Sequence, residues 1–269
     1  METNLLLKAH LKKLRLPTML RDVEKAVAEA TSANLTYERF LLGLVEQEVL
    51  QREQNTLRIR LSQARFPLVK TLDTFDFAAI PTLDKQKVLQ LAQGDFIGEP
   101  ANIICLGNSG TGKTHLAIAI GVAACRKNHR VRFFTAAGLV TDLLEAKKDS
   151  RLSKLQRDLN RFDLIILDEL GYIPFDETGA QLLFNFCADR YERAALLITS
   201  NLDFAQWVKV FRDEALSAAL LDRLTHRCHI LVMNGESFRF RQSKQRAFKI
   251  NGKEDPASGS RKAKKDQGQ

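Results

Sequence analysis

The chain has 269 residues, of which 45% are hydrophobic and 27% charged, and its formal net charge is +9. These proportions are ordinary for a globular protein. The sequence contains no apolar run of the roughly 20 residues that a membrane-spanning helix needs, so we expect no membrane partner. The first residues lack a signal-peptide pattern and the four cysteines form no C-x-x-C pair, so we expect a cytoplasmic protein with free thiols.

Positive charge is concentrated at the two ends of the chain. Residues 1–70 contain 12 basic and 8 acidic side chains, residues 71–238 contain 19 and 21, and residues 239–269 contain 10 and 3. Positive charge on both sides of a nearly neutral centre favours a polyanionic partner such as nucleic acid. The alternative is that the basic ends only keep the protein soluble.

The first 65 residues are predicted to be helical. Leucine and alanine recur at helical spacing up to residue 20, with an interruption at Pro17, and residues 22–33 form a second helical stretch. A third helix begins after Thr36, which can cap it. Its apolar face is only partly regular and includes Glu48, and its second half carries Arg52, Arg58, Arg60 and Arg65. This first domain, residues 1–66, is either a small bundle with a solvated basic face or a module that holds DNA or a partner protein.

A second domain, residues 67–250, is entered through the linker segment FPLVKTLDTFDF. In the preferred interpretation Phe75 and Phe77 anchor this linker, and the alternative is that they pack against an adenine. Residues 83–93 are expected to form a short helix and residues 95–101 a turn.

The segment GNSGTGKT, residues 107–114, matches the phosphate-binding pattern G-x-x-x-x-G-K-T. It follows an apolar run suited to a buried strand (102–106) and precedes a stretch suited to a packed helix (115–125), which is the context that this motif requires. Glycines let backbone N–H groups point at a phosphate, Lys113 can reach the β- and γ-phosphates, and the Thr114 hydroxyl can ligate Mg²⁺. A chance match in a glycine-rich turn is the alternative. We predict ATP and Mg²⁺ as cofactors, with these nucleotide-binding residues: Gly107, Asn108, Ser109, Gly110, Thr111, Gly112, Lys113 and Thr114.

Four apolar residues followed by Asp-Glu occur in LIILDE, residues 164–169. A strand over 131–135 and two helices between residues 137 and 159 are expected before it. In an open α/β sheet, ligands bind beyond the carboxyl ends of the strands. Asp168 is therefore predicted to hold Mg²⁺, and Glu169 to act as the general base for the attacking water.

Two more segments carry candidate residues of the site. The apolar strand ALLITS, residues 195–200, is followed by Asn201, whose side chain can contact the γ-phosphate or the attacking water. A turn residue or helix cap is the alternative for Asn201. A helix over 214–225 carries Arg223 in its last turn, where an arginine also interacts favourably with the helix dipole.

The end of the chain begins with an apolar strand, HILVM, at His229. In the following segment, GESFRFRQSKQR, Arg239 or Arg241 either approaches the nucleotide as a second sensor or binds a phosphate backbone. Residues 251–269 lack the hydrophobic side chains needed for a packed structure, so they are predicted to be a disordered basic tail.

The motifs GNSGTGKT, LIILDE, LLITSN, ALLDRLTHR and GESFRFR, behind a helical module and the FP…FDF linker, together resemble the IstB family of IS21 transposition helper ATPases. The resemblance covers about residues 4–250, and this family is close to the helicase loader DnaC. It implies an α/β AAA+ P-loop NTPase core behind a small all-α N-terminal domain. The core sheet is then parallel and flanked by helices, with the strand before Asn201 lying between the other two motif strands. In this class Asn201 is at the sensor 1 position, and Arg223, with Arg227 as its rival, serves the ATP of a neighbouring subunit.

The function that the resemblance implies is ATP-controlled assembly on DNA. Members of the family bind double-stranded DNA with little sequence preference, self-associate into a higher oligomer with ATP, and recruit or activate a partner transposase. The catalytic residues would be Lys113, Glu169, Asn201 and Arg223, with Arg239 at the nucleotide. A DnaC-like loader of the replicative helicase is the alternative function. A nucleotide-dependent scaffold without hydrolysis is a third hypothesis, which the intact Asp168–Glu169 pair disfavours.

Overall fold

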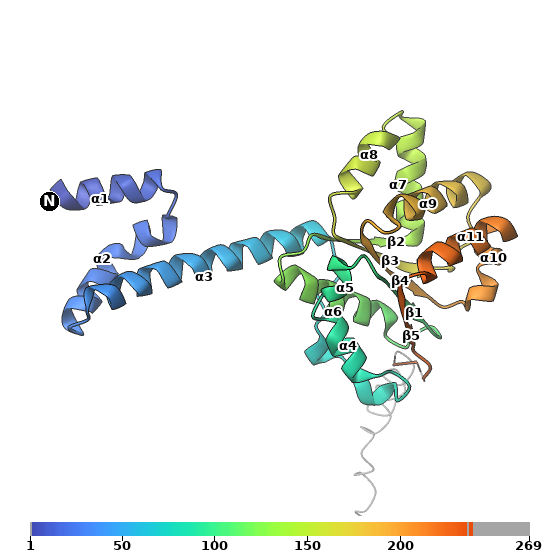
Figure 1. Cartoon of the computed structure of the whole chain (residues 1–269), viewed down its shortest axis with the longest axis horizontal. Helices are drawn as coiled ribbons and strands as arrows, with labels where there is room; N and C mark the ends of the chain where they lie inside the picture. The colour runs from blue at the N-terminus through green and yellow to red at the C-terminus, as the bar shows by residue number, and fades with distance from the viewer. Residues whose placement is uncertain (1, 236, 239–269) are drawn as a thin grey trace, which may run out of the picture.

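A computed structural model describes residues 2–235, 237 and 238. Its centre is a sheet of five parallel strands in the order β2-β3-β4-β1-β5. The strands are β1 (Asn102–Leu106), β2 (Val131–Thr135), β3 (Leu164–Leu170), β4 (Ala195–Ser200) and β5 (Cys228–Val232). In this order β4 lies between β1 and β3, which confirms the arrangement that the resemblance implies. The strands are apolar runs because helices cover both faces of the sheet (Figure 1).

Residues along each strand alternate between two apolar cores, one on each face of the sheet. One face packs against α6 (Lys113–Arg126), the short helices α4 (Lys85–Leu91) and α5 (Asp95–Gly98), and the 3-10 turns Leu72–Thr74 and Phe77–Ala79. The other face packs against α7 (Ala136–Lys148), α8 (Leu152–Leu159), α9 (Glu177–Arg190), α10 (Val208–Phe211) and α11 (Glu214–Thr225), with a 3-10 turn at Phe204–Gln206. This two-sided burial confirms the predicted α/β class.

Several elements differ from the sequence predictions, among them the helix expected over 83–93, which spans Lys85–Leu91, and the strand expected from His229, which begins at Cys228. The turn expected over 95–101 is wrong in part, because Asp95–Gly98 form a short helix after Gly94, whose φ is 85°. Helix α6 begins two residues earlier than predicted, since Gly112 (φ 90°) ends the loop and Lys113 is already helical. Helix α9 has no counterpart among the predicted helices, although the side chain of Asp176 caps its first turn.

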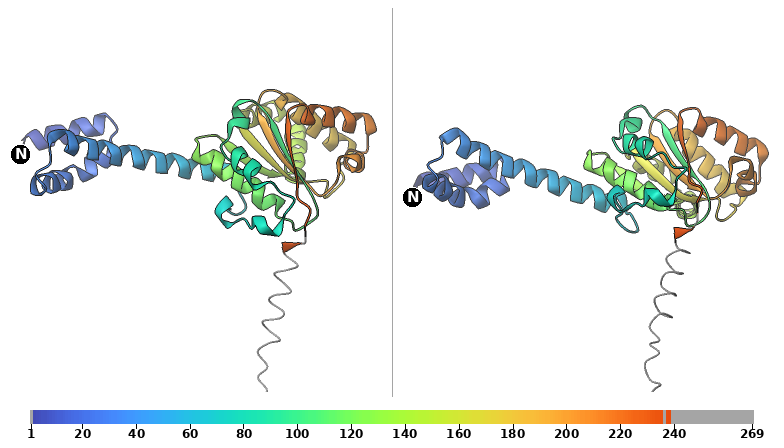
Figure 2. Two further views of the ribbon diagram at one scale, coloured as in Figure 1. Left: turned by 60° about the horizontal axis from the view of Figure 1, so that its bottom comes forward. Right: turned by 90° about the horizontal axis from the view of Figure 1, so that it is seen from below.

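Three helices precede the sheet and form what we call the N-terminal module: α1 (Glu2–Lys13), α2 (Pro17–Ser32) and α3 (Tyr37–Ala64). The Thr36 side chain accepts a hydrogen bond from the N–H of Arg39, so Thr36 caps α3 as predicted. Figures 1 and 2 show α1 and α2 beside the far end of α3, away from the sheet. Neither these helices nor the others in the described part of the chain have the length and apolar character to cross a membrane.

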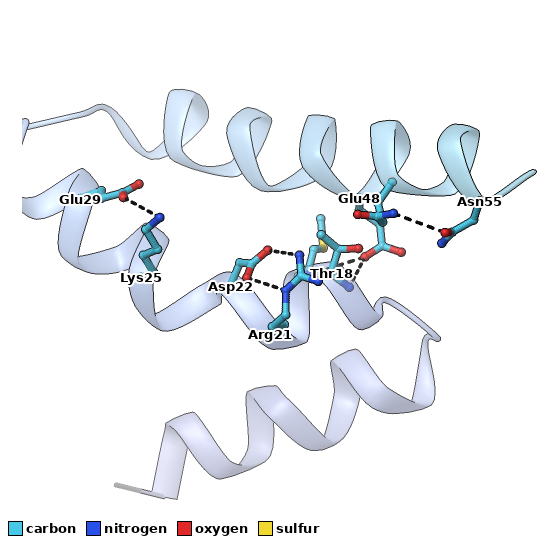
Figure 3. Close-up of polar contacts among 9 residues, drawn as sticks. Thr18, Arg21, Asp22, Lys25, Glu29, Glu48 and Asn55 are labelled. Carbon is cyan, nitrogen blue, oxygen red and sulfur yellow. Dashed lines mark hydrogen bonds and ion pairs between the residues drawn. The ribbon is translucent and has the colours of Figure 1, made fainter. Parts of the chain in front are cut away.

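A buried carboxylate explains why the apolar face of α3 is irregular. Glu48 is only 3% exposed, and it accepts hydrogen bonds from the N–H groups of Thr18 (2.8 Å) and Met19 (3.1 Å) at the start of α2 (Figure 3). The residue before α2 is Leu16, which offers no capping side chain, so Glu48 supplies the acceptor from another helix. Burial alone would raise the pKa of Glu48, but the two N–H groups and the Arg52 side chain outweigh burial and lower it.

The C-terminal end of α3 is seated on the core. The Gln63 carbonyl oxygen accepts a hydrogen bond of 3.0 Å from Arg132 of β2. Phe66, just beyond the helix, approaches Gly121 of α6 so closely that a Cβ on Gly121 would lie 3.0 Å from the Phe66 ring. The same Cβ would lie 2.8 Å from the side chain of Ile166 in β3. The module therefore meets the core at the helix after the phosphate loop and at the strand that carries Asp168.

Candidate nucleotide site

The loop over 107–112 connects β1 to α6 and needs its glycines for both conformation and space. The φ angles of Gly107 and Gly110 are 151° and 83°. A Cβ would lie 2.2 Å from the Met233 carbonyl oxygen at the first position and 2.1 Å from the Ser237 Oγ at the second. The segment after β5 thus presses against the loop, and only glycine fits between them.

Lys113 is the first residue of α6 and is buried. Its Nζ donates hydrogen bonds to the carbonyl oxygens of Gly107 and Asn108, both at 2.7 Å, and the Thr111 hydroxyl donates to the same Asn108 oxygen at 2.9 Å. The positive end of the α6 dipole and the N–H groups of its first turn adjoin this loop. A cationic side chain and backbone donors therefore meet at one place, which is the arrangement that binds phosphate.

The Thr114 hydroxyl lies 2.9 and 3.0 Å from the two carboxylate oxygens of Asp168, which stands near the end of β3. Burial raises the pKa of Asp168, while hydrogen bonds from Thr199 and Thr114 and the charge of Lys113 oppose that rise. A hydroxyl and a carboxylate are hard oxygen donors of the kind that Mg²⁺ prefers. Their closeness fits the predicted magnesium ligands.

Glu169 follows in a left-handed conformation, with φ at 60°. The pairing of β3 with β4 is in register up to Leu167 and resumes shifted at Leu170, so the strand bulges at the Asp-Glu pair. Bulges change the direction in which side chains point and are frequent next to active sites. Here the exposed Glu169 lines the same cleft as the phosphate loop.

The cleft has a volume of about 710 Å³ and is lined by both polar and apolar side chains. Polar lining comes from Lys113, Thr114, Glu169, Thr199 and Asn201, and apolar lining from Phe75, Ala79, Ile80, Ile118 and Phe238. Phe75 is buried and packs edge-on against Phe77 and His115. It therefore anchors the linker and also forms part of the cleft wall. A cleft that offers both kinds of side chain suits a nucleotide, which has an aromatic base and charged phosphates.

Not every predicted residue lies at this cleft. Arg223 is absent from its lining among the described residues. The Arg223 guanidinium lies 5.1 Å from the centre of the Phe184 ring and donates to the Ala219 carbonyl oxygen at 2.9 Å. Arg239, Arg241 and the predicted tail over 251–269 lie outside the described residues.

Two residues at the site, Thr199 and His115, were not predicted from the sequence. The Thr199 hydroxyl contacts both Asp168 and Glu169, and His115 Nε2 lies 3.1 Å from the Thr71 carbonyl oxygen and 3.2 Å from the Thr74 hydroxyl. Burial lowers the pKa of His115. His115 directly follows the phosphate-loop motif, which is the one hint available; nothing local marks Thr199.

Solved structures of the replication initiator DnaA share this fold. AMPPCP-bound DnaA from Aquifex aeolicus superposes with a TM-score of 0.54 at 20% sequence identity, over 70% of this chain and 57% of that one. A second DnaA structure, bound to AMPPCP and single-stranded DNA, gives 0.53 at 19% identity, again over 70% and 57%. At these identities the likeness concerns the fold alone, and it agrees with the AAA+ architecture.

Proteins related in sequence identify the family, whereas the solved structures show only the fold. The chain is 40% identical over 235 residues to a Pseudomonas aeruginosa protein named as an ATP-binding protein of insertion sequence IS21, covering 87% of this chain and 89% of the relative. It is 36% identical over 232 residues to a Geobacillus stearothermophilus protein named likewise for insertion sequence IS5376, covering 86% and 92%. The family profile described as "IstB-like ATP binding protein" matches residues 9–246. The chain therefore belongs to the IstB-like family of ATP-binding proteins of IS21-type insertion sequences.

Proposed function

We propose that this protein is an ATP-hydrolysing, DNA-binding helper of IS21-type transposition. It self-associates on double-stranded target DNA when ATP is bound, recruits or activates the partner transposase, and uses hydrolysis to control the assembly. The observation that carries this proposal is that Glu169 lines one cleft with the phosphate loop while the adjacent Asp168 bonds to Thr114, in a chain whose relatives are named for insertion sequences and ATP binding.

Nucleotide binding follows from the polar and apolar residues that line the cleft. The glycine loop and the start of α6 would donate backbone N–H groups to the phosphates. Lys113 would exchange its two carbonyl partners for phosphate oxygens, which offer stronger, charge-assisted hydrogen bonds. The apolar wall that includes Phe75 and Ile80 would take the base.

Thr114 and Asp168 are the residues that would hold Mg²⁺. When bound there, Mg²⁺ supplies positive charge that offsets the negative charge of the phosphates. Glu169 takes a proton from water, whose oxygen attacks the γ-phosphorus as the bond to the bridging oxygen breaks, leaving ADP and phosphate. Asn201, which lines the same cleft, orients that water or contacts the γ-phosphate.

Arg223 is proposed to complete the site of a neighbouring subunit. It lies away from its own cleft, in the last turn of α11, where its guanidinium has one carbonyl partner and a ring contact. An arginine that joins the phosphates across an interface makes assembly depend on ATP, and hydrolysis then weakens the same contact.

DNA contact is proposed for the basic ends of the chain. We divide the chain into a helical domain (1–66), an ATPase domain (67–250) and a basic tail (251–269), with the positive charge outside the centre. Contacts of lysine and arginine with phosphates carry no sequence information and weaken with salt. Binding to duplex DNA should therefore be largely independent of sequence and sensitive to ionic strength.

The test is to measure the size of the protein with duplex DNA, with and without ATP. ATP and duplex together should produce a large assembly, and Arg223→Ala should prevent it while Arg227→Ala does not. Glu169→Gln should bind ATP but hold the assembly on DNA, because the shape of the base is kept while its charge is lost. If the protein stays small on duplex and instead joins a hexameric helicase, the helicase-loader function replaces this proposal.

A further inference from the structure

The bulge in β3 changes the hydrogen bonding next to the Asp-Glu pair. Between Leu167 and Leu170 the register with β4 shifts, and the N–H of Glu169 lies at this irregularity. This N–H donates to the Thr199 side-chain oxygen of β4, at 3.0 Å. A side-chain hydroxyl of β4 thus serves as the acceptor for a backbone N–H of β3.

The same hydroxyl makes a second contact. The Thr199 Oγ1 donates to a carboxylate oxygen of Asp168 at 2.6 Å, and that carboxylate also accepts from the Thr114 hydroxyl. Thr199 is only 1% exposed, so water does not compete for these bonds. A continuous chain of hydrogen bonds runs from the phosphate-loop helix through Asp168 and Thr199 to the backbone of Glu169.

We propose that Thr199 is a positioning residue for both acidic residues of the site. Its hydroxyl donates to Asp168 and accepts from Glu169 at once, which fixes the Asp168 carboxylate beside Thr114 and holds Glu169 in the left-handed conformation that turns its side chain to the cleft. This inference rests on the proposed roles of Asp168 and Glu169. It assigns the alignment of the two residues to a third residue, which acts through its hydrogen bonds to them.

The side-chain chemistry at this position explains the choice of threonine. Valine has the same shape but would leave a buried N–H and a buried carboxylate oxygen each without one partner, which is costly. The left-handed conformation of a non-glycine residue such as Glu169 is itself unfavourable, and it persists only when its surroundings enforce it. Without the hydroxyl, Glu169 is expected to relax and turn its carboxylate away.

The experiment compares Thr199→Val with Thr199→Ser, which keeps the hydroxyl. Thr141→Val is the control, since the Thr141 hydroxyl bonds only to the carbonyl of Ala137 on the surface of α7. We would measure ATP turnover with DNA present, and the affinity for a fluorescent ATP analogue with and without Mg²⁺. Turnover and the effect of Mg²⁺ on affinity report on the alignment of the acidic residues. Affinity without Mg²⁺ reports on binding by the phosphate loop.

Thr199→Val should bind the analogue without Mg²⁺ as wild type does, because the phosphate loop is untouched. The gain in affinity that Mg²⁺ gives should shrink about tenfold, and kcat should fall about 10–100-fold, as for other residues that orient metal ligands. Thr199→Ser should restore both quantities, and Thr141→Val should leave both unchanged.

Equal kcat and equal Mg²⁺ dependence in Thr199→Val and wild type would overturn the inference. So would an equal defect in Thr199→Ser, because the hydroxyl would then not be the group that matters. If Thr199→Val does not fold, Thr199→Ala against Thr199→Ser provides the same comparison. Absence of turnover in wild type itself would instead contradict the proposed function.

Discussion

The nucleotide core and the N-terminal module are stabilised in different ways. Strands of the core are buried on both faces by two extensive apolar clusters, whereas the buried apolar cluster of the module consists of Leu11, Met19, Val23 and Leu44. Large apolar side chains of α1 and α3 remain exposed, Leu5 at 70% and Leu41 at 58% among them. The core is thus determined by packing from all sides, while the module depends on few contacts and on one buried carboxylate. A substitution in the nucleotide site should therefore change ligand binding without unfolding the core. A substitution of a buried residue in the module should instead destabilise the module as a whole.

The largest effect is expected from Lys113→Ala. Removing the ammonium should weaken ATP binding by about 1000-fold, or about 4 kcal/mol, because a charged donor to the phosphates is lost. Calorimetric titration with ATP measures this. Lys127→Ala, at the other end of α6 and paired with Gln93, is the control and should bind ATP normally. ATP-dependent assembly that survives in Lys113→Ala would contradict the assignment of the phosphate loop.

Arg190→Met should test how strongly the core depends on a single buried cation. The Arg190 guanidinium donates to the carbonyl oxygens of Leu159 (3.2 Å), Phe162 (3.0 Å) and Ala195 (3.4 Å), and burial lowers its pKa to about 10. Methionine would remove three hydrogen bonds to these carbonyls, of which that of Leu159 would keep the N–H of Phe162 at 3.1 Å, so we expect a loss of about 3 kcal/mol in the free energy of unfolding. Denaturant titration measures it, with the exposed Arg193→Met as control. An unchanged midpoint would show that the carbonyls find other partners.

Glu48→Ala should destabilise the module by about 2 kcal/mol while leaving ATP affinity unchanged, because it removes the acceptor for the first N–H groups of α2. Hydrogen exchange of α1 and α2, measured beside that of the sheet, reports each region separately. Glu46→Ala, exposed on the same helix, should have no effect. Equal acceleration of exchange in the sheet would mean that the module and the core unfold together.

Acid should act on the module through the same residue. The folded-state pKa of Glu48 lies below its ordinary value of 4.5, so its ionised form stabilises the fold fully above that pH. This contribution is lost as the pH falls through the lowered pKa. The difference in unfolding free energy between wild type and Glu48→Ala should therefore shrink below pH 4.5. A difference that stays constant down to the lowered pKa would remove ionised Glu48 from this role.

The smallest effect is expected from His115. Its Nε2 holds the linker through the Thr71 carbonyl and the Thr74 hydroxyl, next to the buried Phe75. His115→Ala should weaken ATP binding about threefold by loosening this wall, and His115→Gln, whose amide can donate to the same carbonyl, should restore it. Tripolyphosphate affinity, which needs no base contact, should not change. A matching loss for tripolyphosphate would mean that the phosphate loop itself is disturbed.

Sequence reasoning succeeded where the physical signal is local. Buried parallel strands are apolar runs, so 102–106 and 195–200 could be delimited at both ends, and the spacing within GNSGTGKT fixes a loop before a helix. The helix Glu214–Thr225 was also predictable at both ends; the structure shows the Asp213 side chain capping its start.

What could not be predicted depends on contacts between distant residues. Thr199 and Asp168 are 31 positions apart, and Glu48 and Thr18 are 30 apart. The bulge that joins the first pair has no sequence pattern of its own. Glu48 interrupts an apolar face, and only the structure shows that α2 begins against it. Pairwise contacts of this kind arise from the packed fold and leave no periodic trace in the chain.

The contacts between the C-terminal end of α3 and the core determine how far a small tilt of α3 would move its other end. With 28 residues, α3 is about 42 Å long, and it is held at one end by Phe66 against Gly121 and by Gln63 against Arg132. A tilt of about 10° at these contacts would carry the far end of the helix through about 7 Å, roughly two base-pair steps along a duplex. Small displacements beside the phosphate loop would thereby become several ångströms at the far end of α3, on the scale of the duplex that we propose as the partner.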